Sequence, residues 1–210
     1  MTKGLWSVRF ATVGACLLLV ASLLIALPAF RSLWQRGASQ IVRHVPIEVD
    51  KVYTPSGWLG DAVGGKEIFQ ADFANGENPR LSGRRVMRFS YLPGRVGWAG
   101  LSWIYPQNNW GDHPGIRIEG AKQLSFWAAG ERGGESLEFK LGGTFDLTKA
   151  YQDSAQRKLG PVALTREWRQ YVIKLDGSNL DNLITAFIWV ASAEKNPAGI
   201  TFYLDAPMIE

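Results

Sequence analysis

The segment from Gly97 to His113 holds the densest group of side chains suited to binding chemistry. It places Trp110 beside asparagine, aspartate and histidine, and Pro106 and Pro114 bound a stretch that is typical of a loop. An aromatic face packs against the flat C–H face of a sugar ring, while amide and acid groups hydrogen-bond to its hydroxyls. The pattern therefore predicts a glycan-binding surface. The predicted ligand-binding residues are Trp58, Asn108, Asn109, Trp110, Asp112 and His113.

The aromatic residues of this region also have a purely structural interpretation, in which they fill a core and the asparagines turn the chain. For Trp103 the core interpretation is favoured, because it lies in an apolar run. For Trp110, in a polar loop, exposure is favoured, since loops on a rigid scaffold carry function. Trp58 lies with Tyr53 in a second segment rich in Gly and Pro, which also predicts a loop.

A metal site requires clustered His, Cys, Asp or Glu, and this chain has only two His and one Cys. Calcium is the metal that the acidic residues allow, because the terminal strands of a sandwich lie close together. The predicted metal ligands are Asp50, Glu67 and Asp205. The alternative is that these residues are solvated surface acids. No other cofactor is predicted.

Catalysis finds little support in the sequence. Hydrolysis of a glycan uses a pair of carboxylates, and a Ser-His-Asp set needs a histidine. Outside the N-terminal region the only histidine is His113, and no nucleophile-elbow pattern precedes a serine. Gly133-Gly134 lacks the lysine and helix of a phosphate-binding loop. A binding protein is therefore favoured over an enzyme.

The basic character of the chain does not indicate nucleic acid. The pI of about 9.3 comes from the N-terminal region, where five basic residues and no acidic residue precede position 46. The remainder carries 18 basic and 19 acidic residues, a net charge of −1. The basic residues flank an apolar segment, where they concern lipid headgroups rather than phosphates of a polynucleotide.

The segment Phe10–Phe30 contains no charged residue, and Trp6 and Trp34 flank it. As a helix it would be about 32 Å long, which matches the hydrocarbon core of a bilayer. It therefore predicts a retained transmembrane anchor with an exported domain; the alternative is a cleaved signal peptide and a secreted domain. The expected organisation is an anchor over 1–36, a linker over 37–45 and a folded domain over 46–210.

From Pro46 onward, short alternating runs are separated by turn signals, which predicts strands. Leu137, Phe139 and Leu141 alternate with polar residues, and similar runs occur around positions 87–91, 171–175 and 200–204. Further strands are expected over 49–53, 99–105, 124–128, 161–165 and 183–190. The fold class is therefore all-β, a two-sheet antiparallel sandwich of the jelly-roll kind.

Three segments of the chain together resemble the galactose-binding-like jelly rolls, which include bacterial carbohydrate-binding modules. They are Trp168-Arg169-Gln170-Tyr171-Val172-Ile173-Lys174-Leu175, the apolar run Leu183–Val190 and the last strand Thr201–Asp205. The resemblance implies a β-sandwich and carbohydrate binding without catalysis. In such modules the last strand commonly carries two consecutive acids, whereas here Ala206 and Pro207 follow Asp205.

The function expected from the sequence is thus non-catalytic glycan binding by a domain presented at the cell envelope. The alternative is an envelope scaffold that binds a protein partner through the same aromatic residues. A glycan site is expected to show aromatic faces in a groove beside polar groups, whereas a protein partner needs a larger apolar patch.

Overall fold

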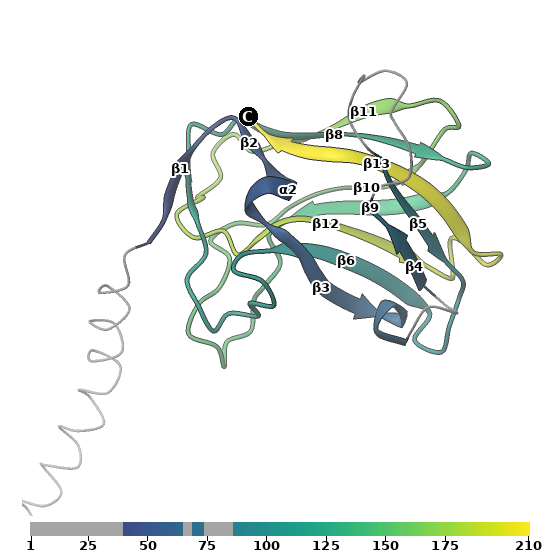
Figure 1. Cartoon of the computed structure of the whole chain (residues 1–210), viewed down its shortest axis with the longest axis horizontal. Helices are drawn as coiled ribbons and strands as arrows, with labels where there is room; N and C mark the ends of the chain where they lie inside the picture. Colours follow the sequence, from purple (N-terminus) through teal and green to yellow (C-terminus); the bar gives the residue numbers. More distant parts are fainter. Residues whose placement is uncertain (1–39, 65–68, 74–85) are drawn as a thin grey trace, which may run out of the picture. The chain divides into compact units, whose positions relative to one another are not determined.

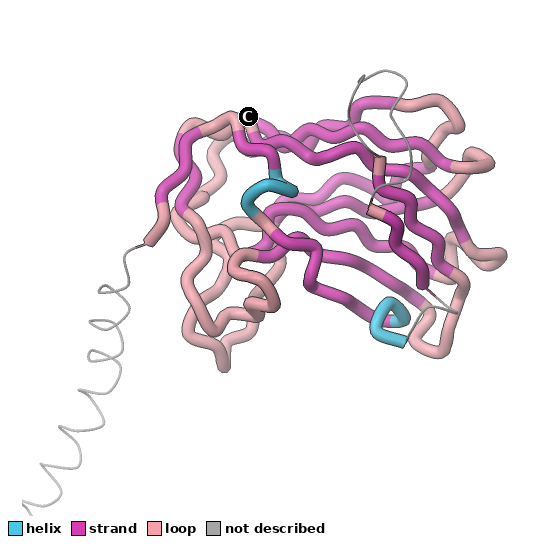
Figure 2. The backbone as a smooth tube through the Cα atoms, in the orientation of Figure 1, coloured by secondary structure: helices cyan, strands magenta, loops and turns pink. Residues whose placement is uncertain are grey.

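Two antiparallel sheets face each other in the computed structural model, which describes residues 40–64, 69–73 and 86–210 (Figures 1 and 2). Residues 40–210 form one compact unit. The sheet that we call the β12 sheet has the order β10 (Arg157–Ala163), β9 (Ser136–Leu141), β12 (Thr185–Ser192), β6 (Trp98–Ile104) and β3 (Thr54–Gly60). The β13 sheet has the order β11 (Arg169–Lys174), β8 (Gln123–Gly130), β13 (Ile200–Ile209), β5 (Met87–Tyr91) and β4 (Phe69–Asp72), with β2 (Ile47–Glu48) also paired to β13. The predicted all-β antiparallel sandwich is confirmed.

Alternation of apolar and polar residues explains why these segments form half-buried strands. In β9, Leu137, Phe139 and Leu141 are fully buried, and the polar residues between them are partly exposed. The same alternation buries every second residue of β5. β12 is apolar on both faces and lies at the centre of its sheet, as its sequence predicts.

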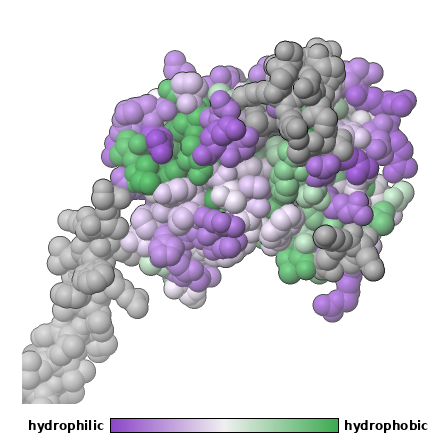
Figure 3. All heavy atoms as spheres, viewed as in Figure 1, coloured by the Kyte–Doolittle hydropathy of each residue, from purple (hydrophilic) through white to green (hydrophobic). Residues whose placement is uncertain are grey.

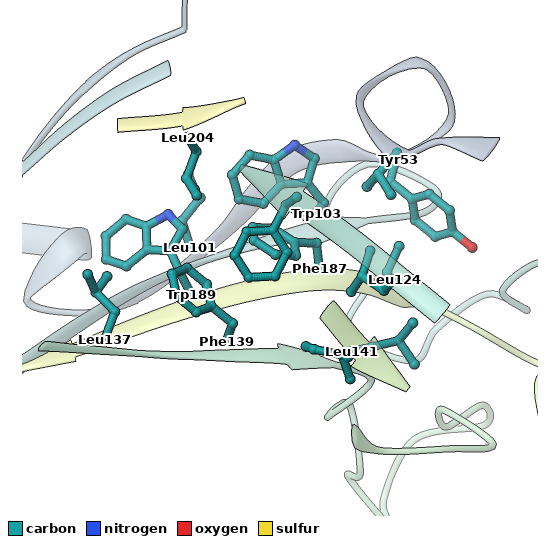
Figure 4. Packing of buried hydrophobic residues seen from close by; sticks show 14 of the residues in the cluster. Tyr53, Leu101, Trp103, Leu124, Leu137, Phe139, Leu141, Phe187, Trp189 and Leu204 are labelled. Carbon is teal, nitrogen blue, oxygen red and sulfur yellow. The ribbon is translucent and has the colours of Figure 1, made fainter. Parts of the chain in front are cut away.

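Large aromatic side chains fill the space between the sheets (Figure 4). Trp103 of β6 is fully buried and meets Phe187 of β12 edge to face, with ring centroids 5.3 Å apart. Trp189 of β12 stacks on Phe69 of β4, and its ring centroid lies 5.0 Å from that of Phe202 of β13. Trp189 therefore packs the β12 sheet against the β13 sheet. The prediction that Trp103 is a core residue is confirmed.

Two local predictions are wrong. The segment expected as a strand over 49–53 is mostly a short helix, α2 (Val49–Val52), because Val49 and Tyr53 are both buried and their spacing of four residues puts them on one helical face. The expected loop around Trp58 is instead β3, which pairs with β6 and so extends the β12 sheet. A 3-10 turn, η1 (Asp61–Gly64), follows β3.

The chain enters the domain along β1 (Val42–His44), which runs parallel to β7 (Arg117–Glu119). Part of the segment expected as a linker is therefore a paired strand. Ile41 and Val42 are exposed here, and Figure 3 shows hydrophobic atoms gathered over this end of the domain. Among the described residues no helix is both long and apolar enough to cross a bilayer. The predicted anchor, Phe10–Phe30, lies outside the described residues.

Asp61 holds the turn between β5 and β6 against the end of β3. Its buried carboxylate accepts hydrogen bonds from the Tyr91 hydroxyl (3.0 Å) and from the backbone N–H groups of Gly94 (3.0 Å), Val96 (2.8 Å) and Gly97 (3.0 Å). Burial raises the pKa of Asp61, but these four hydrogen bonds outweigh burial and bring the pKa below its usual value. Burial and the neighbouring carboxylate raise the pKa of Tyr91 to about 12.

We expect Asp61→Asn to lower the free energy of unfolding at pH 6 by about 1–3 kcal/mol, because the amide turns an N–H group toward backbone donors. Since the folded-state pKa of Asp61 is lowered, its stabilisation is present above the unfolded pKa and is lost as the pH falls through the folded pKa. Urea unfolding at pH 6 and pH 3 measures both effects. Equal stability differences at the two pH values would contradict this role of the ionised carboxylate.

Candidate functional site

The predicted loop site contains one residue that serves the loop itself. Asn109 is 2% exposed. Its Nδ2 donates to the carbonyl oxygens of Tyr105 (3.0 Å) and His113 (2.8 Å), and its Oδ1 accepts from the N–H groups of Gly111 and His113 (both 3.0 Å). The amide therefore uses both donors and both acceptor positions within the loop. These contacts give Asn109 a role in holding the loop, and its predicted contact with a ligand stays a prediction.

The other loop residues are at the surface. Asn108 has φ of 59°, and its N–H donates to Ser56 Oγ at 3.0 Å, which fastens the loop to β3. Asp112 receives both hydrogen bonds of Lys149 Nζ, at 2.8 and 2.9 Å, so its carboxylate is already paired. His113 is exposed. Trp110 is 38% exposed, as predicted.

A second loop, which contains residues 145–151, contacts the first and adds exposed apolar side chains to this surface. The N–H of Tyr151 donates to the carbonyl of Gly111 at 2.9 Å, next to the Asp112–Lys149 ion pair. This second loop exposes Phe145 and Leu147. We call these two residues together with Trp110 the loop tip; all three are exposed apolar side chains.

Trp58 does not belong to the loop tip. It lies on β3 opposite Leu101, three positions along β6 from the end where the loop begins. Its ring meets Phe69 of β4 edge to face, with centroids 5.5 Å apart. Trp58 therefore covers the open side of the sandwich between the two edge strands.

The predicted calcium ligands are only partly described. Asp50 is exposed on α2, whereas Asp205 is fully buried on β13; Glu67 lies outside the described residues. Among the residues that are described, no three acidic, His or Cys side chains gather in a way that could hold a metal. The calcium site stays a prediction, which chelation tests. A site of this kind would stabilise the folded state by mass action, so EDTA should lower the melting temperature. A melting curve that is unchanged by exhaustive chelation would remove it.

The outer face of the β13 sheet carries a group of residues that the sequence did not single out. Tyr203 lies between buried Phe202 and Leu204, so its side chain points away from the core. The strand register places Tyr203 opposite Ala129 of β8 on one side and Arg88 of β5 on the other. Trp168 immediately precedes β11. Because Arg169 pairs with Ala128, Trp168 continues the row of Arg88, Tyr203 and Ala129 across the sheet.

A hollow of about 430 Å³ opens on this row. Ala129 and Gly130 are small and form its floor, while Trp168 and Tyr203 stand around it with ring centroids 6.5 Å apart and planes at 56°. Its lining residues are Val86, Ala129, Gly130, Glu131, Arg166, Trp168 and Tyr203. Hollows of this size hold small ligands or a few units of a polymer.

Polar groups are fixed within the hollow. Glu131 accepts a hydrogen bond from the Tyr203 hydroxyl at 3.2 Å and lies 3.6 Å from the Arg88 guanidinium. Arg166 adds a second guanidinium, and its Cγ packs beside Gly133. Two aromatic rings with a carboxylate and guanidinium groups can pack on a sugar ring and hydrogen-bond to its hydroxyls.

Among the described residues that line the hollow, Glu131 is the one that carries a carboxyl group. Glycosidases of the common type need two carboxylates on either side of the bond that breaks.

The sequence contained a weak signal for this site. Tyr203 stands between apolar residues that are buried, so alternation alone predicts that it faces outward. The position of Trp168 could not be found in this way, because it depends on the register between β11 and β8.

Comparison with families of known proteins finds no matching family model, and comparison with curated proteins finds no match. Solved structures do match. The family 11 carbohydrate-binding module of a cellulosomal cellulase of Clostridium thermocellum is 13% identical, with a TM-score of 0.50, over 81% of this chain and 95% of that one. A family 30 carbohydrate-binding module is 16% identical with a TM-score of 0.47, over 83% of this chain and 89% of that one.

These identities are low, so the likeness concerns the fold. The predicted resemblance to β-sandwiches of the carbohydrate-binding-module type is confirmed at that level. This chain has the β-sandwich fold that is also found in the family 11 carbohydrate-binding module.

Proposed function

We propose that this chain is a non-catalytic glycan-binding protein whose site is the outer face of the β13 sheet. The observation that carries the proposal is the hollow between Trp168 and Tyr203, with Glu131 and Arg166 in its lining. The fold supports it, because similar solved structures are named as carbohydrate-binding modules. The aromatic rings pack on sugar faces, and the charged groups select among hydroxyls and substituents.

The site is open and shallow, so each binding event is weak. A Kd between micromolar and millimolar, about 4–8 kcal/mol of binding free energy, fits a site with two aromatic rings. We propose that Phe10–Phe30 anchors the chain and presents the exported domain at the cell envelope. Many anchored copies on one polysaccharide would then bind with avidity.

Affinity electrophoresis of the full chain in gels that contain different polysaccharides tests the proposed function. At least one polysaccharide is expected to retard the wild-type protein, and its soluble oligosaccharides are expected to compete. If a broad panel of neutral and acidic polysaccharides leaves the mobility unchanged at high loading, glycan binding is contradicted.

The loop tip supports the second candidate function, which is binding of a protein partner in the envelope. Its three apolar residues are exposed, with Leu147 at 87%, Phe145 at 47% and Trp110 at 38%. Such a surface matches a protein interface better than a glycan site, because the neighbouring Asp112 and Asn109 are already engaged. Substitutions in the tip and in the hollow therefore separate the two functions.

A further inference from the structure

The charges on the outer face of the β13 sheet are unevenly balanced. Arg88 and the Tyr203 hydroxyl both engage Glu131, so the one carboxylate of the hollow is already paired. Arg166 lines the same hollow and makes no ion pair in the part of the chain that the structure describes. Among the described residues, the hollow thus presents a guanidinium that is not ion-paired with a carboxylate.

A second, smaller hollow of about 220 Å³ on the same face also has an arginine in its lining. Gln70, Ser90 and Thr201 lie in register across β4, β5 and β13 and form its floor. Arg132 stands at its side and, like Arg166, has no ion pair within the described ranges. The Ser90 and Thr201 hydroxyls bond to each other at 2.9 Å, which fixes the floor between the strands.

The two hollows lie one after the other along β13. Tyr203 belongs to the first and Thr201 to the second, and both point outward from β13. Two residues of a strand span about 7 Å, so the hollows are neighbours along the strand. An extended polymer lying parallel to β13 would occupy both and would pass the guanidinium groups of Arg166 and Arg132 in turn.

We propose that the ligand of this face is an acidic polysaccharide of the uronate class, whose carboxylates meet Arg166 and Arg132. The proposal rests on the glycan-binding function proposed above and names its substrate class. A guanidinium offers a planar pair of N–H donors that matches a carboxylate, which makes arginine the suitable side chain. Residues 46–210 carry a net charge of −1, so attraction of a polyanion depends on the local placement of these arginines rather than on the charge of the whole domain.

Three uronate polymers, polygalacturonate, alginate and glucuronoxylan, are compared with the carboxyl-reduced form of each, which keeps the backbone and removes the charge. The full chain is expected to bind at least one acidic polymer about tenfold more tightly than its reduced form, and 0.5 M NaCl should remove most of this difference. Arg166→Gln and Arg132→Gln should each weaken binding of the acidic form several-fold more than binding of the reduced form. Arg157→Gln, on β10 of the other sheet, is the control with the same loss of charge.

The outcomes separate the two proposals. Equal binding of acidic and reduced polymers, or binding of neutral polysaccharides alone, overturns the acidic substrate class and leaves glycan binding in place. An equal loss in Arg157→Gln and Arg166→Gln also overturns it, because the effect would then be one of net charge. Absence of binding to every polysaccharide overturns the glycan function itself.

Discussion

Trp103→Ala is expected to lower the free energy of unfolding by about 3–5 kcal/mol, a large loss for a single truncation. Trp103 is fully buried on β6, and it packs on Phe187 and on Phe89 of the opposite sheet. Alanine would leave a cavity between the two sheets. The sheets cannot close this cavity without breaking the pairing of their strands. One effect works against this loss, because Trp103 Nε1 has no hydrogen-bond partner among the described residues and its removal relieves a buried donor.

Chemical denaturation of the full chain in detergent measures this difference, with Trp110→Ala as the matched control. Trp110 is partly exposed on the loop tip, so its truncation should change the unfolding free energy by less than about 1 kcal/mol. A similar loss in both variants would contradict the assignment of Trp103 to the core and of Trp110 to the surface.

Trp168→Ala is expected to weaken polysaccharide binding about tenfold or more while the domain stays folded. An aromatic face contributes about 0.5–1.5 kcal/mol beyond the area that it buries, and 1.4 kcal/mol corresponds to a tenfold change in Kd. Trp168 stands at the side of the hollow just before β11, so its loss removes a wall of the site without opening the core. Trp168→Phe keeps a ring and should retain part of the affinity.

Trp110→Ala is again the control, since it truncates an exposed tryptophan of the loop tip and leaves the hollow intact. Affinity electrophoresis and isothermal titration with the same polysaccharide compare the two variants. Loss of binding in Trp110→Ala with full binding in Trp168→Ala would move the glycan site to the loop tip, as the sequence alone predicted.

Strands such as β5 and β9 were predictable because they bury alternate residues. Leu137, Phe139 and Leu141 need no knowledge of their neighbours to indicate a half-buried strand, and the structure buries all three. The short helix α2 was not predictable in this way, because the apolar residues of 49–53 fit a strand and a helical turn equally well. β3 was missed because its Gly and Pro residues indicate a loop, whereas Gly57 serves close packing against Ile104 and Ser102.

The site was less predictable than the fold. Sequence reasoning favours residues that are close together in the chain, and Asn108, Trp110 and Asp112 satisfied that condition. Burial of Asn109 and the Asp112–Lys149 ion pair depend on contacts that only the folded loops show. The hollow joins β5, β8, β13 and the segment before β11, so its residues come together through strand register alone.

Hydroxyl-radical footprinting of the full chain, with and without a polysaccharide that retards it, tests the central claim most directly. The account predicts that the polysaccharide lowers the oxidation of Trp168 and Tyr203, while Trp110 and Leu147 of the loop tip keep their rates. Trp168 and Tyr203 are half-buried and Trp110 and Leu147 are exposed in the free protein, so each region reports on itself. Protection of Trp110 with unchanged oxidation of Trp168 and Tyr203 would contradict a glycan site on the outer face of the β13 sheet.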